Sequence, residues 1–203
     1  MSISRLNERL ILASKSAGRA AVLSAAGLTF EQIVSGVDED AIKDSLRAEG
    51  VSVGDQADAL AETKAIRVST RHLGIVLGAD QMLEVEGRPL DKANSRAEAR
   101  EYLQLLRGRT HTLHSAIVAC IEGAPVWRHI SRPKLTMRPF SDAFLDAYLD
   151  EIGDDALTTV GCYKIEGRGA HLFEKIEGDQ YTIMGLPLLP LLRWLRDRHS
   201  LPA

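Results

Sequence analysis

Apolar residues alternate along the chain between short continuous runs, which are typical of buried strands, and stripes with the period of a helix. The runs predict strands at Leu10–Ala13, Phe30–Val34, the hairpin Gly74–Leu90, Thr110–Cys120, Val126–Met137 and His171–Ile176. The stripes predict helices at Ala17–Ala26 and Asp55–Val68, from Ser95, after Ser141, and around Leu188–Leu195. This mixed order of strands and helices predicts an α/β fold.

Capping residues support several of these helix ends. Ser16 stands directly before the first predicted helix and Gly27 closes it, which are positions that these residue types favour. Ser95 and Glu98 have the spacing of a capping box, and Gly108 ends the helix that they begin. These local signals place the helices independently of the apolar pattern.

The composition is that of an ordinary globular chain. Of the 203 residues 45% are hydrophobic and 26% charged, and no repeat, low-complexity segment or linker interrupts them. We therefore expect a single domain over residues 1–203. The formal net charge of -3 gives no general attraction to nucleic acid or anionic membranes, so any bound phosphate must be held by local cations.

Cysteine usage and the length of the apolar runs bear on location. Cys120 and Cys162 have neither the spacing of a zinc site nor the density of a disulfide framework, which favours a reducing compartment. The apolar run near the N-terminus is too short for a signal peptide core, and no run is long enough to span a bilayer. We expect a cytoplasmic protein without a nucleic-acid or membrane partner.

The segment from Ser14 to Arg19 is the first with candidate chemistry. A strand, a turn of small residues and a helix N-terminus leave backbone N–H groups pointing outward, where an anion can bind near Ser14 and Ser16. Arg19 lies in the first helical turn, where its charge opposes the helix dipole, and it can offer two parallel hydrogen bonds to phosphate. Turns of this kind also occur without ligands.

Two carboxylates are candidates for metal binding or acid–base chemistry. Asp80 follows an apolar strand and two small residues, and strand ends favour Mg²⁺ or Mn²⁺ ligands and general bases as well as simple turn caps. Glu39 lies in an acidic segment, where a solvated charge is the simpler interpretation.

Two lysines are candidates for phosphate binding. Lys64 falls on the apolar stripe of its predicted helix, where an ammonium group needs an anionic partner unless its stem reaches outward to solvent. Lys92 follows the predicted hairpin and, taken alone, is more typical of a solvated surface lysine.

Several common enzyme motifs are absent from the sequence. It contains no P-loop, no dinucleotide-binding GxGxxG fingerprint and no GxSxG nucleophile elbow. Its six histidines form no recognised zinc pattern. Kinases of the P-loop class, Rossmann dehydrogenases and α/β-hydrolases are therefore disfavoured.

The order of the remaining motifs resembles the Maf family of nucleoside triphosphate pyrophosphatases over nearly the whole chain. The resemblance rests on segments that follow one another in the family's order: Leu10–Ser16 with Arg19, Val37–Glu39, Leu60–Ala65, Gly78–Asp80, Lys92, Gly108–His111 and Gly185–Pro187.

The resemblance implies a fold, an activity and a set of site residues. The fold would be an elongated, mixed-sheet α/β fold of the Maf and inosine-triphosphatase type, with two lobes around a central cleft and often a homodimer. The activity would be divalent-metal-dependent hydrolysis of a nucleoside triphosphate to its monophosphate and pyrophosphate. Asp80 would activate water, and Glu39 and Asp80 would hold Mg²⁺ or Mn²⁺. The triphosphate would contact Ser14, Ser16, Arg19, Lys64 and Lys92.

The same resemblance bears on base choice. Gln81 resembles the 7-methyl-GTP group of the family, whereas the group that favours dTTP and UTP usually has Thr after the catalytic aspartate. Glu166 resembles the same group, and its carboxylate can accept hydrogen bonds from the edge of guanine. Gly18 stands where relatives commonly have a large Arg or Trp, which implies a wider pocket. We expect an enzyme that clears modified nucleotides such as 7-methyl-GTP; the alternatives are a dTTP/UTP pyrophosphatase and a nucleotide-binding regulator of cell division or septum formation.

Overall fold

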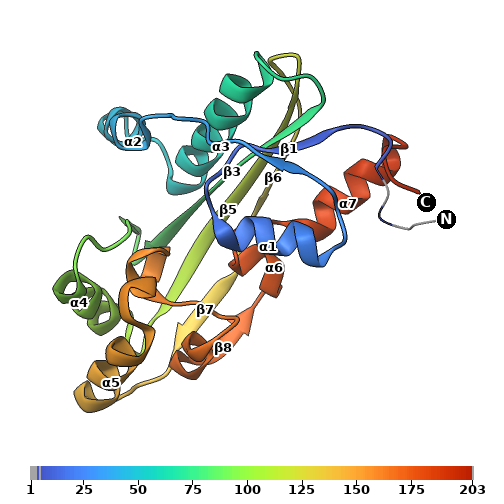
Figure 1. The fold of residues 1–203 in the computed structure, drawn as a ribbon. Helices are drawn as coiled ribbons and strands as arrows, with labels where there is room; N and C mark the ends of the chain where they lie inside the picture. The colour runs from blue at the N-terminus through green and yellow to red at the C-terminus, as the bar shows by residue number, and fades with distance from the viewer. Residues whose placement is uncertain (1–3, 5, 203) are drawn as a thin grey trace. The chain divides into compact units, whose positions relative to one another are not determined.

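The computed structural model describes residue 4 and residues 6–202, and these form an eight-stranded mixed sheet with helices, so the predicted α/β class is confirmed (Figure 1). The strands are, in chain order, β1 (Leu10–Leu12), β2 (Glu31–Gln32), β3 (Ile75–Val85), β4 (Arg88–Leu90), β5 (Thr110–Ile121), β6 (Ala124–Ser131), β7 (Lys134–Met137) and β8 (Phe173–Glu177). They hydrogen-bond in the order β2-β1-β3-β5-β7-β8, while β4 pairs with β3 and β6 with β5.

The helices follow the predicted order, with two additions. They are α1 (Ala17–Ala25), α2 (Glu39–Ala48), α3 (Val53–Ser69), α4 (Arg96–Leu106), α5 (Asp142–Ile152), α6 (Gln180–Ile183) and α7 (Leu188–Asp197). Short 3-10 turns cover much of the stretch from 153 to 172. Within the described part of the chain, no helix is both long and apolar enough to cross a membrane.

The chain divides into two compact units, each built from separate stretches of sequence. The first takes its described residues from segments 1–80, 115–131 and 185–203, and the second from 81–114 and 132–184. The polypeptide passes between the units four times, and two of these passages lie within strands: in β3, directly after Asp80, and in β5. The extent of a single domain over residues 1–203 stays a prediction.

In the first unit, β1 is the central parallel strand. It pairs with β2 on one side and with β3 on the other, where Leu10 lies opposite Ile75 and Leu12 opposite Leu77. Ile11 packs in one apolar cluster with Val68 of α3, and because side chains alternate along a strand, Leu10 and Leu12 point to the other face. Figure 1 shows α1 and α3 on opposite sides of β1.

A glycine allows α3 to lie unusually close to β3. A side chain at Gly78 would place its Cβ 2.0 Å from the carbonyl oxygen of Ala61 and 2.7 Å from the backbone nitrogen of Ala65. Only glycine permits such a close backbone approach. Because Gly78 and Asp80 point to the same face of β3, this contact also brings Asp80 to α3.

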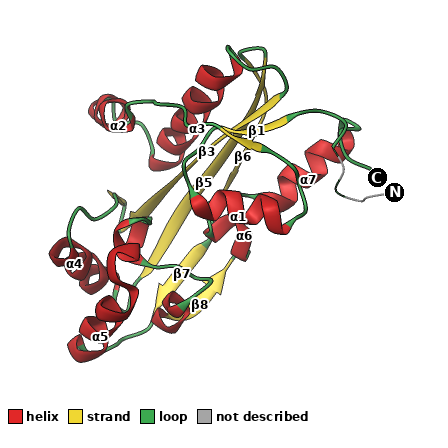
Figure 2. Ribbon diagram, viewed as in Figure 1, coloured by secondary structure: helices red, strands yellow, loops and turns green. Residues whose placement is uncertain are grey.

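The second unit has a core of its own. In it α4 and α5 pack together (Figure 2), and β7 lies between β5 and β8. Fully buried apolar side chains fill this core, among them Leu83, Leu103, Leu106, Leu135, Leu145 and Leu172. Ser95 and Ser141 cap α4 and α5 as the sequence predicts. The carboxylate of Glu98 accepts from the N–H of Asn94.

Three elements differ from the sequence-based expectation. The strand predicted at Val126–Met137 is interrupted between Ser131 and Lys134, where Pro133 lacks the N–H that a continuous ladder needs. The strand predicted at Phe30–Val34 is reduced to the two residues of β2. The acidic segment around Glu39 begins the unpredicted helix α2, which Asp38 caps by accepting from the N–H of Ala41 at 3.1 Å.

Candidate active site

The turn between β1 and α1 is built around two serine hydroxyls. Ser16 caps α1, because its Oγ accepts from the N–H of Arg19 at 3.3 Å. The Oγ of Ser14 accepts from the N–H of Ser16 at 3.2 Å and from Nη1 of Arg19 at 3.0 Å. The carbonyl of Ser14 accepts from Nε2 of Gln32 at 2.7 Å. The predicted helix N-terminus is therefore present, and hydrogen bonds from Arg19 and Gln32 hold the loop before it. Gly18 is half-buried in the first turn of α1.

Arg19 has a structural contact that the sequence did not indicate. Its side chain is buried, and its Nε donates to the carbonyl of Gly185 at 3.0 Å, which ties the segment before α7 to the Ser14 turn. The φ of Gly185 is 101°, in a region that favours glycine, so this residue type suits the backbone at the contact. Burial lowers the pKa of the Arg19 guanidinium, while the charges of Asp80 and Glu39 act to raise it. Arg19 thus lies within the electrostatic reach of both carboxylates.

Lys64 is held between the two candidate carboxylates. Its Nζ lies 2.6 Å from Oδ1 of Asp80 and 3.0 Å from Oε1 of Glu39. Lys64 is 4% exposed and Asp80 5%, while the side chain of Glu39 is 36% exposed. A buried ammonium needs such partners because its desolvation is costly. The sequence left open whether the ammonium group of Lys64 pairs with an anion inside the protein or reaches solvent. The structure shows it buried and paired.

The neighbours of Glu39 keep its carboxylate charged. Its partial burial acts to raise the pKa, but the charge and the hydrogen bond of Lys64, with the charges of Lys43 and Arg19, outweigh that effect and lower the pKa overall. The interpretation of Glu39 as a solvated surface charge is therefore wrong. The sequence could not reveal this contact, because it depends on how α2 packs beside α3.

The backbone of β3 and α3 explains how the Lys64–Asp80 pair forms. Val76, Gly78 and Asp80 alternate along one face of β3. Val76 packs with Val68 of α3, and Gly78 lies against the α3 backbone. Asp80 is the next residue on that face and meets Lys64. The apolar packing of the strand therefore fixes the position of its carboxylate.

The other predicted site residues belong to the second unit. Nε2 of Gln81 donates to the carbonyls of Thr182 and Ile183, at 3.0 and 3.2 Å, so its amide nitrogen is hydrogen-bonded to the backbone of α6. Lys92 is exposed in the loop after β4. Glu166 is exposed, and Nζ of its neighbour Lys164 pairs with Asp155 at 2.8 Å. The roles of Gln81, Lys92 and Glu166 in substrate binding stay predictions.

The Glu39 and Asp80 carboxylates have the chemistry for a hard divalent cation. Carboxylate oxygens are the protein ligands that Mg²⁺ and Mn²⁺ prefer, and Mg²⁺ is commonly bound by one or two carboxylates together with water and phosphate oxygens. Within the described residues no group of three or more His, Cys, Asp or Glu side chains converges to form a complete metal cage. The donor set therefore fits an ion that takes its remaining ligands from water or phosphate oxygens.

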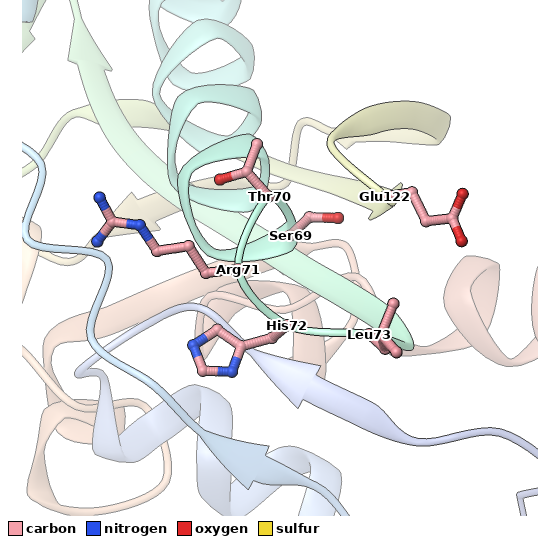
Figure 3. Close-up of a pocket in the computed structure, with 6 residues that line it drawn as sticks. All are labelled: Ser69, Thr70, Arg71, His72, Leu73 and Glu122. Atoms are coloured by element: carbon pink, nitrogen blue, oxygen red, sulfur yellow. The ribbon is translucent and has the colours of Figure 1, made fainter.

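A pocket at the C-terminal end of α3 lies away from these groups. It has a volume of about 360 Å³ and is lined by Ser69, Thr70, Arg71, His72, Leu73 and Glu122 (Figure 3). The carboxylate of Glu122 points away from the guanidinium of Arg71, so these charges do not converge on one ligand. We place the candidate chemistry at the ion pairs of Lys64, because several charged groups meet there.

Comparison with known proteins gives consistent results. A family model described as Maf-like protein matches residues 9–198. A protein of Caulobacter vibrioides named nucleoside triphosphate pyrophosphatase is 54% identical over 185 residues, which cover 91% of this chain and 93% of the relative. One of the same name from Rhodospirillum rubrum is 51% identical, with 96% of both chains covered. A protein of Rhizobium meliloti named 7-methyl-GTP pyrophosphatase is 47% identical over 96% of this chain and 98% of its own.

Proposed function

The chain belongs to the family of Maf-like proteins, and from this premise we propose that it hydrolyses a nucleoside triphosphate to the monophosphate and pyrophosphate. The observation that carries the proposal is the buried Lys64, paired with both Asp80 and Glu39. Two carboxylates and a lysine, with Arg19 in electrostatic reach, can hold a metal ion and neutralise phosphate charge at one place. The names of the relatives from Caulobacter and Rhodospirillum support the same reaction.

In the proposed reaction Asp80 is the general base. It accepts a proton from water while the water oxygen forms a bond to the α-phosphorus. The bond from that phosphorus to the oxygen bridging to the β-phosphate breaks, and pyrophosphate leaves with the bonding electrons. Lys64 and Arg19 offset the negative charge that develops on the phosphoryl oxygens. Ser14 and Ser16, at the start of α1, bind phosphate oxygen through the helix N-terminus.

A divalent cation completes the proposal. Glu39 and Asp80 would hold Mg²⁺ or Mn²⁺ together with phosphate oxygens. When bound, the ion supplies positive charge to the phosphates and orients them. The two buried, free cysteines support a reducing compartment, and hence the cytoplasm, as the place of the reaction. The homodimer implied by the family resemblance is part of the proposal and can be tested by light scattering during size-exclusion chromatography.

We propose 7-methyl-GTP as a preferred substrate. The support is the resemblance of Gln81 and Glu166 to that group of the family and the name of the relative from Rhizobium meliloti. Gly18, where relatives commonly have a large side chain, would leave more room for a modified purine. The choice of 7-methyl-GTP has less support than the reaction, because the relatives from Caulobacter and Rhodospirillum are named nucleoside triphosphate pyrophosphatase without a particular base.

The first experiment measures pyrophosphate release from dTTP, UTP, CTP, GTP, ITP and 7-methyl-GTP with Mg²⁺ or Mn²⁺. We expect the highest kcat/KM with 7-methyl-GTP, and a fall in kcat of roughly a thousandfold or more in Asp80→Asn, since the base is lost while the shape is kept. Asp197→Asn is the matched control, because Asp197 lies on the exposed side of α7 in an ion pair with Arg193.

Three outcomes would contradict parts of this proposal. A preference for dTTP and UTP would contradict 7-methyl-GTP as the preferred substrate but would leave the proposed reaction standing. Wild-type rates in Asp80→Asn would exclude Asp80 as the base. Nucleotide binding without turnover in the wild-type protein would exclude the hydrolytic reaction in favour of a regulatory role.

A further inference from the structure

We propose that Lys64 is an exchangeable cation, which binds the two carboxylates in the metal-free protein and gives up its place between them to a divalent ion. The inference rests on the metal site of the proposed function. It starts from the position of Nζ, 2.6 Å from Asp80 and 3.0 Å from Glu39. Lys64 therefore competes with the metal for these oxygens instead of helping to bind it.

The distances favour a direct exchange. Magnesium–oxygen bonds are about 2.1 Å long, so the two oxygens need to approach the ion's place by less than about 1 Å each. Asp80 is buried at 5% exposure on a strand held by apolar packing. Glu39 is in the first turn of α2, none of whose residues is fully buried, and its side chain is 36% exposed, so its carboxylate has more freedom to move than that of Asp80. Glu39 is thus the ligand that moves.

The charges give the exchange a consequence for substrate binding. The two negative charges of Asp80 and Glu39 are balanced by the two positive charges of Lys64 and Arg19, so these four groups have no net positive charge to offer a triphosphate. Two of the three N–H donors of Lys64 face carboxylates. When a divalent ion binds the carboxylates, Lys64 can turn its charge and its donors to phosphate oxygen. Lys64 then first neutralises the two carboxylates and, after the ion has bound, contacts the phosphate.

The exchange predicts that a variant without the lysine binds metal more tightly. We would titrate Mn²⁺ into wild-type protein and Lys64→Met without nucleotide, and follow free Mn²⁺ by electron paramagnetic resonance. Lys64→Met is expected to bind Mn²⁺ roughly tenfold more tightly, because the competing cation is gone. Asp80→Asn combined with Lys64→Met should lose this binding, since it removes one of the two ligands.

A charge-matched control separates competition from a general electrostatic effect. Lys43, on α2, also lowers the pKa of Glu39 through its charge, but the ion pairs of the described residues place Lys64 between Glu39 and Asp80. Lys43→Met should change Mn²⁺ affinity by no more than about twofold, as expected for a half-exposed charge. Lys64→Arg keeps a cation at the site and should not reproduce the gain of Lys64→Met.

Stability supplies a second measurement, because removing Lys64 leaves Asp80 buried without its partner. Lys64→Met should melt at a lower temperature than wild type without metal, and Mn²⁺ should raise its melting temperature more than that of wild type. Lys64→Gln, which keeps one hydrogen-bond donor, is the variant to use should Lys64→Met fail to fold.

The exchange is overturned by several results: equal or weaker Mn²⁺ binding by the neutral Lys64 variant, no measurable binding by it, or an equal gain in Lys43→Met. None of these measurements involves turnover. The Mn²⁺ titrations therefore test the exchange whether or not the wild-type protein hydrolyses a nucleotide. The nucleotide assay tests the proposed hydrolysis whether or not Lys64 exchanges with a metal ion.

Discussion

The first unit buries polar groups as ion pairs around Lys64, whereas the second buries His111 and Tyr163 as a neutral hydrogen-bonded pair. Nε2 of His111 and the hydroxyl of Tyr163 are 2.8 Å apart, and His111 is 1% exposed. Burial lowers the pKa of His111 to about 4 and raises that of Tyr163 well above its ordinary value, so both are uncharged at neutral pH. The buried groups near Lys64 are paired with opposite charges, whereas His111 and Tyr163 are buried in their neutral forms.

The difference can be traced to the surroundings of each group. The rings of Tyr163 and Phe173 lie beside His111, at centroid distances of 5.6 and 6.1 Å, and among the described residues His111 forms no ion pair. Lys64 instead faces two carboxylates. The ionic cluster is the one to which the proposed function assigns binding and chemistry, and we expect the neutral pair to serve only the stability of the second core.

The largest expected effect comes from Gly78→Ala, which forces α3 and β3 apart. The new Cβ would lie 2.0 Å from the carbonyl oxygen of Ala61, so the backbone must shift. We expect a loss of about 3 kcal/mol in the free energy of unfolding. Pyrophosphate release should fall with it, because the shift separates Lys64 from Asp80. Urea unfolding and the nucleotide assay measure the two effects.

Gly167→Ala is the matched control for this change. Gly167 has a φ of -136°, and a Cβ there would have its nearest neighbour 3.9 Å away, so the alanine fits. Its free energy of unfolding should stay within about 1 kcal/mol of wild type. If Gly78→Ala proves as stable and active as Gly167→Ala, the close approach of α3 to β3 does not position Asp80.

The sequence predicts the first unit's elements better than its contacts. Strand β1, the Ser16 cap and helix α3 follow from local patterns of apolar and capping residues. The pairing of Glu39 with Lys64 does not, because a local pattern within α2 cannot show which helix it packs against. The bond from Arg19 to Gly185 joins residues that are 166 positions apart, and no local pattern encodes such a contact.

In the second unit, the sequence predicts α4 and α5 from their caps and apolar faces but misses the short helix α6. It fails where the chain is irregular, in the 3-10 turns between 153 and 172, which lack a repeating pattern. The neutral state of His111 depends on Tyr163 and Phe173, which approach it from distant parts of the chain. Sequence patterns identify residue types and local elements, whereas burial and pairing arise from tertiary packing.

The second prediction concerns pH. The pKa of His111 is lowered from 6.5 to about 4, so between these values the unfolded chain binds the proton that the folded protein excludes. The contribution is fully present above pH 6.5 and is lost as the pH falls toward 4. From pH 7.5 to pH 5 the loss should be about 2 kcal/mol. Urea unfolding at several pH values measures it.

His111→Gln is the variant that isolates this effect. Glutamine does not titrate, yet its amide can hydrogen-bond to Tyr163. Acidic residues titrate in both proteins, so the informative quantity is the difference between their pH profiles. Parallel profiles for wild type and His111→Gln would show that His111 is not the group that binds the proton on unfolding.

The smallest expected effect is that of Tyr163→Phe, which tests whether the neutral pair is purely structural. The change removes the hydroxyl that pairs with His111 and keeps the ring that meets Phe173 edge-on at 4.8 Å. Leaving a buried histidine nitrogen unpaired should cost about 1 to 2 kcal/mol in the free energy of unfolding. Tyr181→Phe, at an exposed tyrosine, should leave the free energy of unfolding unchanged.

Because neither hydroxyl belongs to the ionic cluster, nucleotide hydrolysis should stay at the wild-type level in both variants. A loss of turnover in Tyr163→Phe as large as that in Asp80→Asn would instead assign the His111–Tyr163 pair a role in catalysis and end the distinction between the two units.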